Sequence, residues 1–149
     1  MISLEIAKEL KEAGLKWEPQ IGDMFYWHNG KDWEIDALTS EDVNDNLDEI
    51  RDYIDEGFRI FAPRLDQLLA EIEKRGYSWE MRTVIDESQS VRFNADGVKI
   101  IYRKNIAYWI HVWKTGHIEW EDGFKRAFTS PTDAAASALL WIYEGRAKA

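Results

Sequence analysis

The chain has few residues of the kinds that bind metals or carry protons at neutral pH. It has no cysteine, and its histidines are His28, His111 and His117. The best-spaced group is His117, Glu119 and Glu121, because alternate residues of a strand lie on one face. A metal there would need further ligands from elsewhere, and a ladder of surface ion pairs with Lys114 is the simpler interpretation. We therefore expect no metal site and keep a small enzyme or metal-binding protein using these three residues as an alternative.

Other motifs also argue against catalysis. The run from Asp42 to Leu47 places oxygen side chains at positions 1, 3 and 5 of a possible calcium loop. However, its sixth residue is Leu47 rather than glycine and its twelfth is Tyr53 rather than glutamate, which excludes an EF-hand. The chain contains no G-x-S-x-G, no glycine-rich phosphate loop and no H-E-x-x-H. The sequence predicts a protein that is not an enzyme and has no cofactor.

The negative charge is concentrated in one segment. The net charge is −9, and residues 32–56 alone hold eleven acidic residues against Arg51. This segment is a solubilising surface, a docking surface for a basic partner, or a mimic of the DNA phosphate backbone that occupies a nucleic-acid-binding host protein. A docking surface would use Asp45, Asp48, Asp52 and Asp55. Because no stripe of lysine and arginine stands out, we expect no direct binding to nucleic acid.

Capping residues and glycines delimit four helices. Each expected helix starts at a capping residue or a proline, carries apolar residues at helical spacing and ends at a glycine. The expected helices run from Ser3 to Gly14, from Asn46 to Gly57, from Pro63 to Gly76 and from Ser130 to Gly145. An Asn29-Gly30 turn between Met24–His28 and Lys31–Ile35 predicts a β-hairpin that pairs Tyr26 with Trp33 and Met24 with Ile35.

From Ser78 onward the apolar residues recur with the period of a strand. We expect a meander of four to five strands, with turns at Asn94–Gly97, at Lys104-Asn105 and at Thr115-Gly116. Counting outward from these turns predicts the pairs Phe93–Val98, Val91–Ile100, Ile100–Trp109, Val98–His111, Trp113–Ile118 and His111–Trp120. All of these residues then share one face, which is nearly all apolar and which we expect to form the core.

The opposite face of this meander has an apolar centre. It contains Ile101, Tyr108, Ile110 and Val112, with charged residues around them. A solvated sheet face is mostly polar, so this patch is covered by the N-terminal hairpin or the acidic helix, or it is a surface for a homodimer or another partner.

Eight tryptophans supply large apolar rings for a core or for binding. In the expected register, most of them are core residues. The members of this core group are Trp33, Trp79, Trp109, Trp113, Trp120 and Trp141. Trp17 and Trp27 remain as candidates for exposed binding anchors.

Three stretches of the chain resemble a loose family of small proteins encoded by phages and prophages of Gram-positive bacteria. They are Ile6–Trp17, Pro63–Leu69 with Arg75–Tyr77, and Ser130–Trp141. The resemblance implies a phage-encoded accessory protein that acts inside the bacterial host, and it implies no activity.

Together these observations predict one α+β domain over residues 1–149, with helices on one face of the meander and an additional N-terminal hairpin. The longest apolar stretch, Ala138–Tyr143, is too short to span a membrane. We expect a non-enzymatic interaction protein of the bacterial cytoplasm, with a protein partner or a second copy as its ligand.

Overall fold

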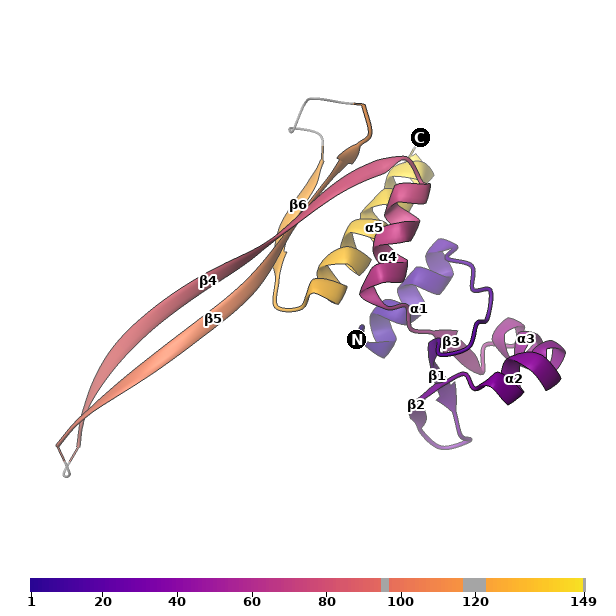
Figure 1. Cartoon of the computed structure of the whole chain (residues 1–149), viewed down its shortest axis with the longest axis horizontal. Helices are drawn as coiled ribbons and strands as arrows, with labels where there is room; N and C mark the ends of the chain where they lie inside the picture. Colours follow the sequence, from indigo (N-terminus) through magenta and orange to yellow (C-terminus); the bar gives the residue numbers. More distant parts are fainter. Residues whose placement is uncertain (95–96, 117–122, 149) are drawn as a thin grey trace.

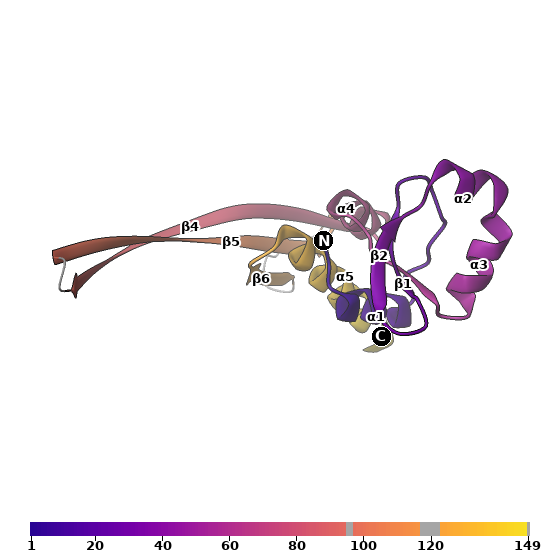
Figure 2. The same cartoon turned by 90° about the horizontal axis from the view of Figure 1, so that it is seen from below.

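The computed structural model describes residues 1–94, 97–116 and 123–148, and the surroundings of side chains except at 86–105, 125 and 146–148. Within these ranges the fold is α+β, with five helices and two three-stranded antiparallel sheets. Figures 1 and 2 show a helical body from which one long β-ribbon projects, with the acidic helices at the other end of the molecule. The α+β class is confirmed, but a single meander of four to five strands was wrong.

The first sheet contains the predicted hairpin in a different register. Its strands are β1 (Met24–His28), β2 (Trp33–Ala37) and β3 (Arg59–Phe61), in the order β2-β1-β3. Tyr26 pairs with Ile35 rather than Trp33, and Met24 pairs with Ala37. The loop has four residues because the side-chain oxygen of Asn29 accepts hydrogen bonds from the N–H groups of Lys31 (2.9 Å) and Asp32 (2.8 Å). A shift of two residues leaves every side chain on its predicted face.

The helices lie close to their predicted positions. α1 (Leu4–Ala13) begins after Ser3, whose hydroxyl accepts from the N–H of Ile6, and ends at the left-handed Gly14. The acidic segment forms two helices, α2 (Ser40–Asp45) and α3 (Leu47–Asp55), where one was predicted. Asn46 makes no side-chain cap for α3, whereas Thr39 and Asp42 cap α2. The sequence signal for α2 was therefore the Thr-x-x-Asp capping box.

Two further helices pack beside each other against the second sheet. α4 (Leu65–Lys74) begins two residues after Pro63, and α5 (Pro131–Lys148) begins at the predicted proline with the Asp133 N–H bonded to the Ser130 hydroxyl. Four alanines of α5 are fully buried among α1, α4, β5 and β6: Ala134, Ala135, Ala136 and Ala138. Gly145 does not end α5, which continues to Lys148.

The second sheet contains two very long strands. They are β4 (Tyr77–Asn94) and β5 (Gly97–Lys114), followed by the short β6 (Phe124–Phe128), in the order β4-β5-β6. The predicted pairs Phe93–Val98 and Val91–Ile100 are confirmed. β5 then passes through Lys104-Asn105 without a turn, so the predicted pairs Ile100–Trp109 and Val98–His111 were wrong. A two-residue hairpin turn needs positive φ at both residues, which Lys104 and Asn105 adopt at a cost that a continuing strand avoids.

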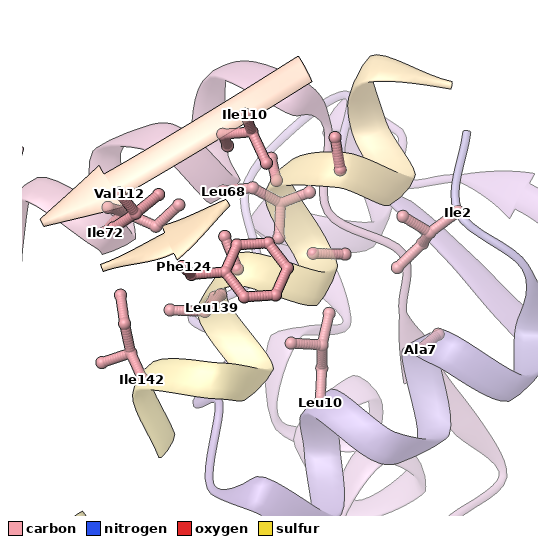
Figure 3. Close-up of a cluster of buried hydrophobic side chains, with 14 of the residues drawn as sticks. Ile2, Ala7, Leu10, Leu68, Ile72, Ile110, Val112, Phe124, Leu139 and Ile142 are labelled. Carbon is pink, nitrogen blue, oxygen red and sulfur yellow. The ribbon is translucent and has the colours of Figure 1, made fainter. Parts of the chain in front are cut away.

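The missing turn exchanges the two faces of the sheet. Ile110 and Val112 lie on the helix-covered face and are fully buried against α4 and α5, whereas Trp109 on the other face is 36% exposed. Figure 3 shows Ile110 and Val112 among Leu68, Ile72 and Phe124. The face expected to be the core is therefore the outer face at this end of β5. Ile118 and Trp120 of the remaining predicted pairs lie outside the described residues, and His111 pairs with Lys125 of β6.

The tryptophans follow this exchange. Trp33, Trp79 and Trp141 pack on the main core as predicted. Trp17 and Trp27, the candidates for exposed anchors, are half-buried against a second cluster of Phe25, Leu38 and Ile50. The ring of Trp17 stacks on Phe61 with centroids 5.0 Å apart. These two rings therefore join α3 to the first sheet and are not binding anchors.

Gly123 lies so close to β5 that a side chain there cannot fit. A Cβ at this position would clash with the carbonyl oxygen of Val112 and lie 3.1 Å from Nε2 of the buried His111. We expect Gly123→Ala to lower the free energy of unfolding by about 2 kcal/mol, because backbone cannot yield as a flexible side chain does. Urea denaturation measures the change.

Gly145→Ala is the matched control, since a Cβ at Gly145 meets nothing within 4 Å and lies in α5. Its expected effect is a gain of up to about 1 kcal/mol from helix propensity. Equal stabilities of the two variants would contradict the close packing of Gly123 on β5.

Candidate interaction surfaces

Asp23 fixes the junction between the first sheet and α4. It is 2% exposed, and its carboxylate accepts hydrogen bonds from Trp17 Nε1 (2.9 Å), the Gln20 N–H (3.0 Å) and Gln67 Nε2 (2.8 Å). Arg64 Nη1 lies 3.5 Å from the same carboxylate. A buried carboxylate with this many donors is satisfied structurally, so Asp23 positions three segments and has no lone pair directed at a ligand.

The acidic surface consists of α2, α3 and the loop that joins them. The predicted docking residues Asp45, Asp48, Asp52 and Asp55 are all exposed. Asp48, Asp52 and Asp55 recur at helical spacing along the outer side of α3, while Ile50 on its inner side is buried. The structure therefore presents these carboxylates together on one surface, as a docking surface requires.

Two cations hold the acidic helices from beneath. Lys11 Nζ donates to the carbonyl oxygen of Ile54 (2.9 Å), near the end of α3 where cations stabilise the helix dipole. The guanidinium of Arg59 lies between the rings of Phe25 (4.8 Å) and Tyr53 (5.3 Å). The Tyr53 hydroxyl donates to Glu49, a bond that raises the pKa of Tyr53. These contacts order α3 on the body and leave its carboxylates toward solvent.

The cavity beside Arg59 is too small for a substrate. It has a volume of about 30 Å³ and is lined by Ala7, Lys11, Leu15, Trp17, Ile54, Arg59 and Phe61. Space of this size accommodates one or two water molecules. Such a water would satisfy Arg59 Nη1, which is buried without a protein hydrogen-bond partner. This cavity therefore offers no room for catalysis on a small molecule.

The predicted apolar patch is divided by the structure. Ile110 and Val112 are core residues at 0% exposure, and Tyr108 is half-buried, so this part is covered from within the chain. The cover comes from α4 and α5 rather than from the predicted hairpin or acidic helix. The surroundings of the Ile101 side chain lie outside the described residues. Ile110 and Val112 therefore cannot belong to an interaction surface.

A group of exposed apolar residues lies instead on the ribbon of β4 and β5, which we call the arm (residues 82–109). β6 pairs with β5 only from Tyr108 to Val112, so beyond that point the ribbon has two strands. Among the arm residues whose side chains the structure describes, four large apolar ones are exposed: Val84 45%, Ile85 52%, Ile106 42% and Trp109 36%. Ile85 and Ile106 are cross-strand partners on the face that continues from the core. Figures 1 and 2 show the arm projecting from the body with no helix beside it.

Sequence reasoning missed Ile85 and Ile106 as surface residues. The available signal was that apolar residues continue at every second position on both sides of Lys104, at Ile100, Tyr102, Ile106 and Tyr108, with no glycine at Lys104-Asn105 to support a turn. This pattern favours one continuous strand, which is long enough to extend past the covering helices. Because the ribbon extends past the helices that cover it, Ile85 and Ile106 are exposed.

His117, Glu119 and Glu121 lie outside the described residues. Among the residues that the structure describes, no group of three histidine, aspartate or glutamate side chains could hold a metal ion.

No helix in the described ranges is long and apolar enough to cross a membrane. Comparisons of the chain with protein-family models, curated proteins and solved structures gave no match.

The cap of α2 makes the acidic surface sensitive to pH. The Thr39 N–H and hydroxyl both donate to Asp42 Oδ2 at 2.9 Å, and these bonds, the backbone one first, lower the pKa of Asp42. A lowered pKa stabilises the fold above the ordinary carboxyl range, and this stabilisation is lost as pH falls through the lowered value. We expect a carboxyl-carbon NMR titration to show that the pKa of Asp42 lies below the ordinary value of an aspartate.

Thr39→Ala removes the hydroxyl and retains the backbone donor. Its expected effect is a partial return of the Asp42 pKa toward the ordinary value and a loss of about 1 kcal/mol of stability from the missing cap. Ser40→Ala, one residue further along, serves as control and should leave the titration unchanged. An Asp42 titration identical in all three proteins would show that the capping box does not form.

Proposed function

We propose that this protein is a non-enzymatic interaction protein that binds another protein through the apolar face of its arm. The observation that carries the proposal is the exposed pair of Ile85 and Ile106, on the face that continues from the core. A two-stranded ribbon is marginally stable alone in water, and uncovered apolar surface at such a site is typical of protein interfaces. In this proposal the acidic helices keep the chain soluble while the arm is free.

The proposed setting is that of an accessory protein encoded by a phage or prophage and acting in the cytoplasm of its bacterial host. It rests on the resemblance to such proteins of three stretches: Ile6–Trp17, Pro63–Leu69 with Arg75–Tyr77, and Ser130–Trp141. An accessory protein of this kind acts by occupying or joining other proteins. A projecting arm fits that role better than a closed cavity of about 30 Å³ does.

Neighbouring residues of β4 provide a matched test. Ile85 lies on the apolar face and Val84 on the opposite face, and both are about half exposed. The tagged protein is mixed with bacterial lysate and an untagged copy of the chain, and the retained proteins are quantified. We expect wild type and Val84→Asp to retain a protein in near-stoichiometric amount and Ile85→Asp to lose at least about 90% of it, because a carboxylate in an apolar interface is costly to bury. Thermal unfolding should show equal stability of the two variants, and retention by Ile85→Asp equal to that of wild type would refute the proposal.

A second candidate function is supported by the acidic surface. Asp48, Asp52 and Asp55 share the exposed side of α3, as a decoy for a nucleic-acid-binding host protein requires. This function predicts capture of basic proteins that weakens steeply as salt is raised, because screening shortens the range of the carboxylate field. Replacement of Asp45, Asp48, Asp52 and Asp55 by asparagine should abolish that capture. Capture unchanged by the four replacements would exclude the decoy.

A further inference from the structure

The arm has one apolar and one polar face, and the cross-strand register identifies both. Six pairs occupy the face that continues from the core: Thr83–Tyr108, Ile85–Ile106, Glu87–Lys104, Gln89–Tyr102, Val91–Ile100 and Phe93–Val98. The pairs on the opposite face are Val84–Ala107, Asp86–Asn105, Ser88–Arg103, Ser90–Ile101, Arg92–Lys99 and Asn94–Gly97. The first set is apolar at both ends, and the second is mostly polar and basic toward the tip.

The apolar face of the arm continues a surface that is already covered in the body. On the same face, nearer the body, Ile110 and Val112 are fully buried under α4 and α5. These helices end their contact with the sheet near β6, and Figure 2 shows the ribbon extending well past them. The sequence therefore continues to specify a buried face over a length that the described part of the chain does not cover.

The order of polar and apolar pairs along this face is symmetric about its middle. Glu87–Lys104 and Gln89–Tyr102 are the two central pairs, with apolar or mixed pairs on either side of them. Turning a second arm end to end places its Val91–Ile100 pair over Ile85–Ile106, and its Phe93–Val98 pair over Thr83–Tyr108. The same operation places the Gln89–Tyr102 pair of the second copy over Glu87–Lys104. By register position, apolar pairs thus fall opposite apolar or mixed pairs, and the two central polar pairs fall opposite each other.

We propose that the arm binds the arm of a second copy of this chain, face to face and antiparallel, around a two-fold axis. This inference rests on the proposed function and names its partner. A face that is complementary to itself under a two-fold rotation is the requirement for a closed dimer. The central polar pairs set the register, because a slip of one pair in either direction places one of them, Glu87–Lys104 or Gln89–Tyr102, opposite an apolar pair.

The size of the contact predicts weak, concentration-dependent association. Ten residues of strand extend about 34 Å and a two-stranded ribbon is about 10 Å wide, so each copy contributes a footprint of roughly 350 Å². The two copies together would bury roughly 700 Å², which is below the ~1,200 Å² of stable specific complexes and in the range of weak, transient contacts. We therefore expect dissociation in the micromolar range rather than a permanent dimer.

Adjacent residues of β5 allow a matched test of the face. Ile100 lies on the apolar face and Ile101 on the opposite face, and the two are consecutive in one strand. Light scattering over a concentration series is carried out on wild type, Ile100→Asp and Ile101→Asp. We expect wild type and Ile101→Asp to form dimers and the dissociation constant of Ile100→Asp to be at least about 100-fold higher, because a carboxylate in an apolar interface is costly to bury. Monomers at all concentrations for wild type, or equal dissociation constants for the two variants, would overturn the proposal.

The antiparallel arrangement has its own test, because the chain has no cysteine to interfere with labelling. Single nitroxide labels are placed at Ser88→Cys, beside the two-fold axis, and at Asn94→Cys, near the tip. Asn94 lies six residues along β4 from the two-fold axis at Ser88. Pulsed electron resonance should therefore measure about 40 Å between the two copies' labels at Asn94→Cys and about 20 Å between their labels at Ser88→Cys. Short distances at both sites would indicate parallel arms and would overturn the antiparallel proposal. Because Ser88 and Asn94 lie on the polar face, labels there leave the proposed contact intact.

These outcomes separate this inference from the proposed function. A chain that captures a host protein in an Ile85-dependent manner and remains monomeric retains the proposed function and loses the dimer. A chain that neither dimerises nor captures a protein loses both. Hydrogen exchange of the arm amides in Ile100→Asp and Ile101→Asp shows whether either substitution unfolds the ribbon, and equal exchange assigns the loss of association to the face.

Discussion

The close packing of α5 against the second sheet is the interaction on which the rest of the structure depends. Its buried alanines leave little side-chain volume, so the helix axis comes close to β5 and β6, and α1 and α4 reach it from its other sides. Leu139 and Ile142 fill the space between these elements, as Figure 3 shows. The face of the sheet that contacts α5 is thereby fixed, and the same face becomes the apolar face of the arm.

The two ends of the molecule follow from this arrangement and differ in chemistry. At one end, α2 and α3 dock through a second apolar cluster of Phe25, Leu38 and Ile50, and Lys11 and Arg59 hold them from below. At the other end, β4 and β5 extend beyond the helices that cover them. Apolar residues of this two-stranded ribbon are therefore exposed. The body thus separates a strongly acidic surface from an apolar one, and each keeps its character because no described segment bridges them.

Local sequence signals predicted the positions of the helices, and one wrongly predicted turn accounts for the errors in the second sheet. Ser3, Gly14, Pro131 and the other capping residues located the helices, because a cap is chosen by the backbone of a few neighbouring residues. The turn at Lys104-Asn105 was wrong, and since strand faces alternate, that single error placed Ile110 and Val112 outside and Trp109 inside. β3 was not predicted because three residues carry too little pattern, and it pairs with β1 only through tertiary contact. The arm could be recognised only after its strands were known to continue past the covering helices.

Charge also favours one orientation of the proposed pair of arms. The segment 32–56 carries a net charge of −10, whereas the rest of the chain sums to +1, and it lies at the end of the body remote from the arm. Parallel arms would bring two such bodies together at one end, whereas antiparallel arms hold them at opposite ends, separated by more than the length of the ribbon. Screening at physiological salt acts over about 8 Å, so repulsion between bodies is negligible in the antiparallel pair and present in the parallel one. In the proposed dimer the acidic surface therefore acts together with the central polar pairs of the arm, and repulsion between the acidic surfaces selects how two copies meet.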